Sequence, residues 1–181
     1  PAVATPYACS GVTVYSALKK ALPVGDDEWL TIMGCGGLGL AAVTIAKALG
    51  VKNVASCDID DAKLAAAKQS GASATVNLTA ANAQDKLREI TDSGPRAVVD
   101  TVGAEATSSF GIASLVKGGR YVIVGLFGGE LRVPLPSLPL RAVSILGSYT
   151  GNLSELKELI QLVKDGKVKP IPVATRPLAE V

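Results

Sequence analysis

From residue 28 onward, short apolar runs alternate with longer segments whose apolar positions recur every three or four residues. Short runs rich in valine and isoleucine are typical of buried strands, whereas the three-to-four-residue spacing is typical of helices that bury one side. The pattern predicts strands at 30–33, 54–57, 74–77, 97–100, 120–124 and 144–147. It predicts helices at 38–49, 61–70, 82–91, 103–115 and 152–165.

Strands that alternate with helices predict a parallel sheet that is buried on both faces. Six such strands make a complete doubly wound α/β fold, the Rossmann arrangement, with strand order 3-2-1-4-5-6. The last helix has the clearest signals, because Asn152 and Glu155 form a capping pair and Gly166 follows its end.

Three segments fall outside this alternation. Residues 1–24 contain one short predicted helix, at 13–22, and residues 171–181 begin a further element. The proline-bearing stretch Leu131–Arg141 predicts an irregular excursion between the fifth and sixth strands, because proline in sheets is confined to edges and loops.

The most informative local feature is the turn Gly34-Cys35-Gly36-Gly37-Leu38-Gly39, which follows the first strand and opens a long helix. Gly34 permits a tight turn, Gly36 lets the backbone come against a pyrophosphate, and Gly39 lets helix and strand pack closely. The helix N-terminus then offers free N–H groups and a partial positive charge to phosphates. This order of elements predicts a dinucleotide site.

An acidic residue, Asp58, ends the second strand, 19 residues past Gly39. We expect it to accept hydrogen bonds from the 2′- and 3′-hydroxyls of the adenosine ribose. A 2′-phosphate would bring like charges together, so NAD is expected over NADP. Ile59 offers no positive charge to such a phosphate, and Lys63 lies either along the ribose or on a solvated helix face. A plain glycine-rich turn, the alternative interpretation, leaves Asp58 unexplained.

The carboxyl ends of the later strands should line the rest of the cleft, because ligands bind beyond these ends in open parallel sheets. The ends carry Thr101-Val102-Gly103, Gly125-Leu126-Phe127 and Gly147-Ser148-Tyr149-Thr150. Small residues there suit a close approach of the backbone to a flat ligand, although ordinary strand-to-helix turns also favour glycine. Asp100, just before the first of these ends, is interpreted as structural rather than catalytic.

Composition narrows the function classes. A length of 181 residues fits one domain, and a net charge of +2 without a basic block indicates neither nucleic acid nor a membrane surface as a partner. The longest weakly polar stretch, 32–46, is too short and too rich in glycine to span a bilayer. Three cysteines, an odd number without metal-ligand spacing, favour a reducing, cytoplasmic setting. The absence of histidine leaves no imidazole for proton transfer.

Several motifs occur in one order over nearly the whole chain. They are the run CSGVTVY at 9–15, the glycine turn, DID at 58–60, VDTVG at 99–103 and GRYVIVG at 119–125. Together they resemble the zinc-dependent medium-chain alcohol dehydrogenases. The resemblance implies a nucleotide domain that works beside a barrel-like catalytic domain holding the catalytic zinc.

The resemblance also implies a division of the chain. Residues 1–24 match a bridging segment with a short helix, residues 25–170 the NAD-binding Rossmann domain, and residues 171–181 the start of a return to a catalytic domain. Cys9 matches one ligand of the catalytic zinc. Because zinc requires three or four ligands, this chain alone is expected to bind no zinc and to be inactive.

The resemblance assigns roles to particular positions. Thr13 packs behind the nicotinamide ring, and Asp58 and Lys63 contact the ribose. Further matched positions are the pyrophosphate cradle Gly36, Gly37 and Leu38 and the cofactor walls Val102, Gly125, Leu126 and Tyr149. In the intact protein, the implied reaction is hydride transfer from a zinc-bound alcohol to NAD, a small alcohol or carbonyl compound being the substrate.

Two other functions remain open. A zinc-independent quinone or enone reductase of the same superfamily is one, although these enzymes favour NADPH and both Cys9 and Asp58 speak against it. A non-catalytic module that senses NAD is the other. The sixth strand is an expected sheet edge, and Leu131–Leu146 is where a homo-oligomer contact is expected.

Overall fold

Six parallel strands form one sheet within the described residues of this computed structural model, which are 4–170, 173 and 175–180. The strands are β1 (Trp29–Met33), β2 (Asn53–Asp58), β3 (Ala74–Asn77), β4 (Ala97–Asp100), β5 (Arg120–Ile123) and β6 (Ser144–Gly147). Their order is β3-β2-β1-β4-β5-β6, which confirms the predicted doubly wound arrangement. The order reverses between β1 and β4, so a ligand crevice is expected beyond their carboxyl ends.

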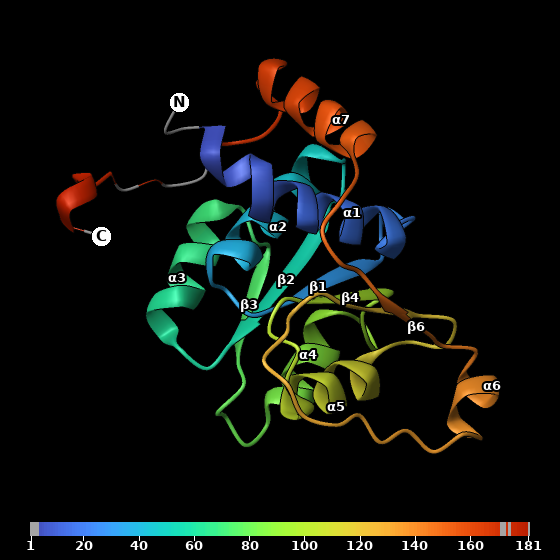
Figure 1. Cartoon of the computed structure of the whole chain (residues 1–181). Helices are drawn as coiled ribbons and strands as arrows, with labels where there is room; N and C mark the ends of the chain where they lie inside the picture. The colour runs from blue at the N-terminus through green and yellow to red at the C-terminus, as the bar shows by residue number, and fades with distance from the viewer. Residues whose placement is uncertain (1–3, 171–172, 174, 181) are drawn as a thin grey trace.

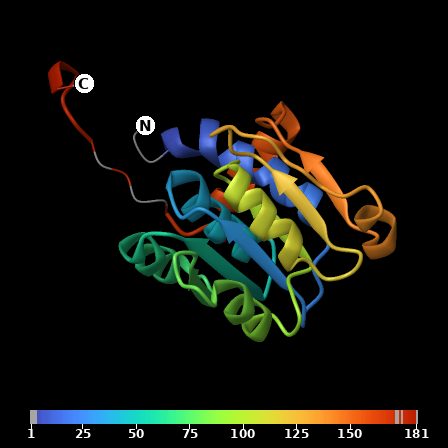
Figure 2. The ribbon, with the colours of Figure 1, turned by 90° about the horizontal axis from the view of Figure 1, so that it is seen from below.

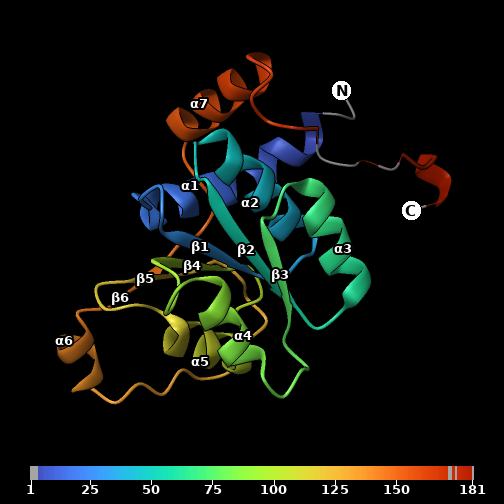
Figure 3. The same cartoon turned by 180° about the vertical axis from the view of Figure 1, so that it is seen from behind.

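Helices cover both faces of this sheet (Figure 1). One face carries α1 (Val12–Ala21), α2 (Gly37–Ala48), α3 (Asp61–Ser70) and α7 (Leu153–Lys164), and the other carries α4 (Ala83–Ile90) and α5 (Glu105–Ser114). Figure 3 shows the same two layers from behind, and Figure 2 looks onto the face that α4 and α5 cover. In the described part of the chain, no helix combines the length and the apolar character needed to cross a bilayer.

Two helix starts follow directly from their capping residues. The Asp60 side chain accepts hydrogen bonds from the N–H groups of Ala62 and Lys63, at 2.8 and 3.2 Å, and so begins α3. At α7, Asn152 Oδ1 accepts from the Glu155 N–H and Glu155 Oε2 accepts from the Asn152 N–H, both at 2.9 Å. The predicted capping pair is thereby confirmed.

The N-terminal segment contains more helix than the sequence predicts. A π-helix, η2 (Tyr7–Gly11), runs directly into α1, so α1 needs no side-chain cap at its start. Gly11 lies at the junction, and a Cβ atom there would be 3.2 Å from Leu159 Cδ2 of α7. The absence of a side chain at this position therefore allows α7 to pack tightly against the helical segment.

The excursion Leu131–Arg141 is not wholly irregular, contrary to the prediction. It contains a short helix, α6 (Ser137–Arg141), in which Pro139 is the third residue. Proline in the first turn of a helix forfeits no intrahelical hydrogen bond, because the N–H groups there have no partner in any case. The Ser137 hydroxyl also donates to the Pro134 carbonyl at 2.7 Å.

Helix α5 begins at Glu105, two residues later than predicted. Gly103 has a φ of +69°, outside the right-handed helical region, so the chain turns there before the helix starts. The predicted return segment 171–181 lies partly outside the described residues; within it the structure describes a 3-10 turn, η3 (Leu178–Glu180).

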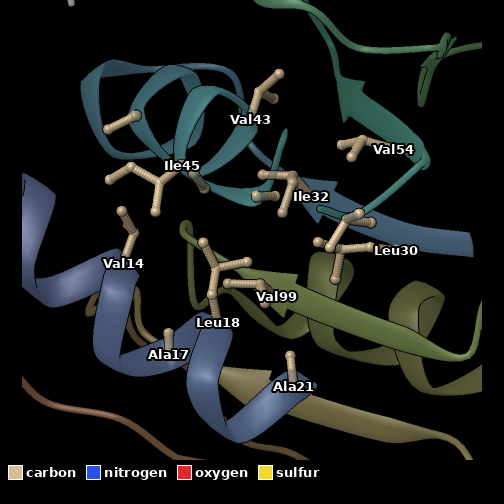
Figure 4. Close-up of a cluster of buried hydrophobic side chains, with 14 of the residues drawn as sticks. Val14, Ala17, Leu18, Ala21, Leu30, Ile32, Val43, Ile45, Val54 and Val99 are labelled. Carbon is tan, nitrogen blue, oxygen red and sulfur yellow. The ribbon is translucent and has the colours of Figure 1, made fainter. Parts of the chain in front are cut away.

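Helix α1 shares the hydrophobic core of the sheet although it precedes β1. Figure 4 shows apolar side chains of α1 directed toward those of α2, β1 and β4; the labelled α1 residues are Val14, Ala17, Leu18 and Ala21. At the end of α1, Arg120 Nε of β5 donates to the Ala21 carbonyl over 2.8 Å. This cation stabilises the negative end of the helix dipole and ties α1 to the sheet.

Truncation of Leu18 tests whether α1 is integral to this core. Leu18 is fully buried, so Leu18→Ala should lower the free energy of unfolding by about 2–5 kcal/mol in urea denaturation. The control is Leu153→Ala, the same change at a leucine that is 66% exposed, with an expected cost below about 0.5 kcal/mol. Equal, small effects of both substitutions would show that α1 contributes little to the stability of the core.

Candidate functional site

The glycine turn between β1 and α2 is held in a conformation that side chains would prevent. Gly34 has a φ of +88°, and a Cβ atom there would lie 2.6 Å from Val102 Cγ2. A Cβ atom on Gly39 would lie 1.9 Å from the Gly34 carbonyl oxygen. These contacts confirm the tight turn and the close helix–strand packing that the sequence predicts for Gly34 and Gly39.

The outer side of the same turn is open. A Cβ atom on Gly36 or Gly37 would meet no heavy atom within 4 Å. Gly36 is the N-cap of α2 and has no side chain to cap the helix, so the N–H groups of the first turn point into this space. With the positive end of the helix dipole, they form a surface suited to an anion.

Asp58, at the end of β2, is 8% exposed and hydrogen-bonded through both carboxylate oxygens. Oδ2 accepts from the Cys35 N–H of the glycine turn at 2.7 Å. Oδ1 accepts from the N–H groups of Ile59 and Asp60 at 2.8 and 3.1 Å. The carboxylate therefore fastens the glycine turn to β2, and Oδ2 retains a lone pair for a further donor such as a hydroxyl.

Asp58 lines two cavities at the carboxyl ends of the strands, one of about 420 Å³ and one of about 360 Å³. Both are also lined by Gly34, Lys63, Val102 and Phe127, so they adjoin. The first adds mostly apolar neighbours: Cys57, Ile59, Leu78, Ala104, Ala106 and Thr107. The second adds Gly36, Gly37, Leu38 and Thr101. An apolar slot thus continues into a backbone surface rich in N–H groups, and a carboxylate lies between them.

The structure brings together most of the predicted residues around Asp58, but not all of them. Gly103, Gly125 and Leu126 line a neighbouring cavity of about 290 Å³. The Ser148 hydroxyl is buried and accepts from Lys20 Nζ at 3.0 Å, and Tyr149 is 76% exposed. The Thr13 hydroxyl donates to the Cys9 carbonyl at 2.7 Å. Thr13, Ser148 and Tyr149 line neither of the two cavities that contain Asp58.

Phe127 is a lining residue that the sequence-based selection of site residues omits. Its side chain is 82% exposed, and it lines both cavities that contain Asp58. Its position directly after Leu126, at the predicted end of the fifth strand, is the feature of the sequence that indicates a lining role. Ile59 and Leu78 also line the first cavity and are not predicted to do so. Each directly follows a strand, and the direction of the chain after a strand depends on the tertiary structure.

A larger cavity, of about 1120 Å³, lies beside the amino ends of the strands, opposite the carboxyl ends where the glycine turn lies. Its lining includes Arg88, Lys117 and Arg141 together with Glu89 and Asp92. Ligands of open parallel sheets bind at the carboxyl ends of the strands, where the glycine turn and Asp58 lie. The smaller cavities therefore form the candidate site.

Comparison with known proteins decides the family. The sequence profile described as zinc-binding dehydrogenase matches residues 37–165. The chain belongs to the zinc-binding dehydrogenase family. This membership confirms the resemblance to zinc-dependent medium-chain alcohol dehydrogenases that the motifs carry.

Individual members of the zinc-binding dehydrogenase family are similar over almost the whole chain. An NAD-dependent alcohol dehydrogenase of Sulfurisphaera tokodaii is 38% identical over 179 residues, which are 98% of this chain and 51% of that protein. An alcohol dehydrogenase of Geobacillus stearothermophilus is 39% identical over 178 residues, 98% of this chain and 52% of that protein. The chain thus spans about half the length of the curated relatives it matches.

The fold agrees with a solved family structure. The crystal structure of the alcohol dehydrogenase from Aeropyrum pernix superposes with a TM-score of 0.85 and 36% sequence identity. The match covers 91% of this chain and 48% of that one. The Rossmann arrangement of the described residues is therefore the one found in this family.

The described residues do not fit a zinc site, in spite of the family name. Cys9 is exposed on η2, and no three His, Cys, Asp or Glu side chains are grouped as metal ligands within residues 4–170, 173 and 175–180. Zinc takes three or four protein ligands in catalytic and structural sites. Cys9 would thus need partners that the described part of the chain does not supply.

The two buried thiols, Cys35 in the glycine turn and Cys57 on β2, add no negative charge beside the turn. Burial, together with the nearby Asp58 carboxylate, raises the pKa of Cys35 to about 12. Burial also raises the pKa of Cys57 well above its usual range. Both thiols are therefore protonated at neutral pH, and Cys35 does not repel an anion bound at the start of α2.

Thiol labelling tests this arrangement. Since only thiolates react with aromatic disulfides, the folded chain at pH 8 should release about one equivalent quickly, from exposed Cys9, and about three in denaturant. The control, Cys9→Ser, should leave no fast phase. A fast phase that persists in this variant would show that Cys35 or Cys57 is accessible and reactive, and would contradict the burial of that thiol.

Replacement of Asp58 tests its role in holding the turn. Asp58→Asn places an amide NH₂ group against one of the backbone donors, so the free energy of unfolding should fall by about 1–3 kcal/mol. Asp26→Asn, at an exposed aspartate paired with Lys52, is the control and should cost less than about 0.5 kcal/mol. Urea denaturation measures both, and equal effects would contradict the structural role of Asp58.

Proposed function

We propose that this chain forms the NAD-binding part of an NAD-dependent alcohol dehydrogenase. The observation that carries the proposal is the buried Asp58 carboxylate between an apolar slot and the open N-terminus of α2. Relatives that share 38% and 37% of its residues are NAD-dependent alcohol dehydrogenases, which supports this choice of cofactor. The activity of the whole protein is part of the proposal, since the chain spans about half of these relatives.

The apolar slot suits the adenine ring, with Ile59, Leu78 and Val102 as walls. Asp58 Oδ2 accepts a hydrogen bond from a hydroxyl of the adenosine ribose, while Oδ1 stays engaged with the backbone. Lys63 lines the same cavities, and its ammonium group offsets part of the charge of Asp58 and of an incoming phosphate. The preference for an unphosphorylated ribose comes from the Asp58 carboxylate, which would repel a 2′-phosphate.

The diphosphate is held at the start of α2. Gly36 and Gly37 leave the space in which the phosphate oxygens approach the backbone, and the first-turn N–H groups of α2 donate to them. When bound, NAD accepts a hydride at its nicotinamide ring. This chain contributes the orientation of the ring, which we place along Thr13, Gly125 and Leu126, with Ser148 and Tyr149 farther out.

The division of the chain at residues 24 and 170 and a homo-oligomer contact through Leu131–Leu146 also remain proposals. β6 lies at the edge of the described sheet, so its outer backbone groups are available for pairing. Zinc analysis of the full-length protein, with an assay for alcohol-dependent formation of NADH, separates the dehydrogenase from a quinone or enone reductase and from a module that only senses NAD.

Calorimetric titration of this chain tests the cofactor preference. NADH should bind at least about tenfold more tightly than NADPH, a difference of about 1.4 kcal/mol, because Asp58 repels a 2′-phosphate. Equal or tighter binding of NADPH would contradict the assignment of Asp58 to the ribose.

A matched pair of substitutions checks the location of the diphosphate. Gly36→Val should abolish NADH binding, because its side chain fills open space at the start of α2, and should lower the melting temperature only slightly, through the poorer N-cap. The control is Gly25→Val, at the amino end of β1, where the nearest contact is the flexible Glu28 side chain at 3.3 Å. Full NADH affinity in Gly36→Val would move the diphosphate elsewhere.

A further inference from the structure

Asp100, the last residue of β4, is fully buried and accepts four hydrogen bonds from side chains and backbone. Oδ1 accepts from the N–H groups of Val102 and Gly103 at 2.8 and 3.0 Å. Oδ2 accepts from the hydroxyls of Thr107 and Tyr121 at 2.8 and 2.5 Å. A buried carboxylate with this many donors fixes the groups around it, because each donor that is lost removes part of the hydrogen bonding that stabilises the charge away from water.

The hydroxyl of Tyr121 remains a donor under all ordinary conditions. Burial and the adjacent charge of Asp100 raise the pKa of Tyr121 well above its usual range. Tyr121 lies on β5, whereas Val102 and Gly103 follow β4. The Asp100 carboxylate therefore connects the neighbouring strand to the turn after its own strand.

The turn after β4 in turn holds the loop after β5. The carbonyl oxygens of Val102 and Gly103 accept from the N–H groups of Phe127 and Gly128, both at 3.1 Å. The two segments pass so closely that a Cβ atom on Gly125 would lie 2.0 Å from the Val102 carbonyl carbon. A displacement of the first segment must consequently displace the second.

Both segments reach the candidate site. Val102 and Phe127 line each of the two cavities that contain Asp58. The Thr101 hydroxyl donates to the Met33 carbonyl at 2.8 Å, next to the glycine turn. Val102 and Phe127, which form the wall of the crevice opposite Asp58, are thus positioned by the turn that is hydrogen-bonded to Asp100.

We propose that Asp100 is a positioning residue for the cofactor crevice. Its buried carboxylate fixes the Val102–Gly103 turn and, through that turn, the loop that carries Phe127, and so sets the width of the crevice opposite Asp58. The inference rests on the proposed NAD-binding function for its effect on affinity, but the linkage between the two segments stands without a ligand.

A second tyrosine–carboxylate pair provides the matched control. Tyr15 of α1 donates to Glu158 Oε2 of α7 at 2.9 Å, away from the crevice. Tyr121→Phe and Tyr15→Phe therefore remove the same kind of hydrogen bond at two places. If Asp100 acts only on stability, NADH affinity should follow the melting temperature equally in both variants.

The experiment measures NADH affinity from nicotinamide fluorescence, at a temperature where every variant of the 181-residue chain is folded. Asp100→Ala should weaken NADH binding by about tenfold or more, and Tyr121→Phe by about threefold. Asp100→Asn keeps an acceptor for the two N–H groups and should restore most of the affinity. Tyr15→Phe should lower the melting temperature without changing the affinity.

Amide NMR spectra of the ligand-free chain provide the second readout. Asp100→Asn and Tyr121→Phe should shift the resonances of Phe127 and Gly128, and Tyr15→Phe should not. Unshifted resonances in the first two variants overturn the proposal, also if Asp100→Ala does not fold. Wild-type NADH affinity in Asp100→Ala, or equal affinity losses in the two tyrosine variants, overturns it as well. If the unaltered chain binds no NADH, the proposed function fails, and the spectra still decide the linkage.

Discussion

Backbone turns at the carboxyl edge of the sheet approach one another so closely that only glycine fits, and two buried carboxylates hold them there. Gly39 packs against the Gly34 carbonyl, and Gly125 packs against the backbone of Val102. Asp58 accepts hydrogen bonds from N–H groups of the turns that follow β1 and β2, and Asp100 accepts hydrogen bonds from N–H groups of the turn that follows β4. Each carboxylate satisfies backbone donors that the tight turns leave without a carbonyl partner.

This edge depends on the rigidity of the layers behind it. Strands β1 and β4 are buried by helices on both faces, so their carboxyl ends cannot shift without opening a packed core. Helix α1 adds to this restraint because it packs on α2, whose N-terminus forms the surface suited to an anion (Figure 4). Packing between α1 and α2, away from the glycine turn, thus determines where the first-turn N–H groups of α2 lie.

The sequence alone predicts the strand order, the glycine turn and Asp58, because these depend on local spacing and on the handedness of parallel crossovers. It places Phe127 at a strand end that faces the cleft but does not single it out as a site residue, since its approach to the crevice depends on the contact between the loops after β4 and β5. It interprets Asp100 as structural but cannot name Tyr121 as its partner, because that pairing requires the register of β4 and β5. Helix α6 is missed because Pro134 and Pro136 before it and Pro139 within it suggest a loop.

The double use of Asp58 couples cofactor preference to architecture. One oxygen supports the turn into α3, and the other supports the glycine turn and, on the proposed function, the ribose. A substitution that removes its charge would relieve repulsion of a 2′-phosphate but would also leave the Cys35 N–H without its acceptor. A change of preference toward NADP in this scaffold would therefore require two changes, a cation near the ribose and a new acceptor for the Cys35 N–H. The second requirement follows from the hydrogen bonds of the protein itself and does not depend on the proposed function.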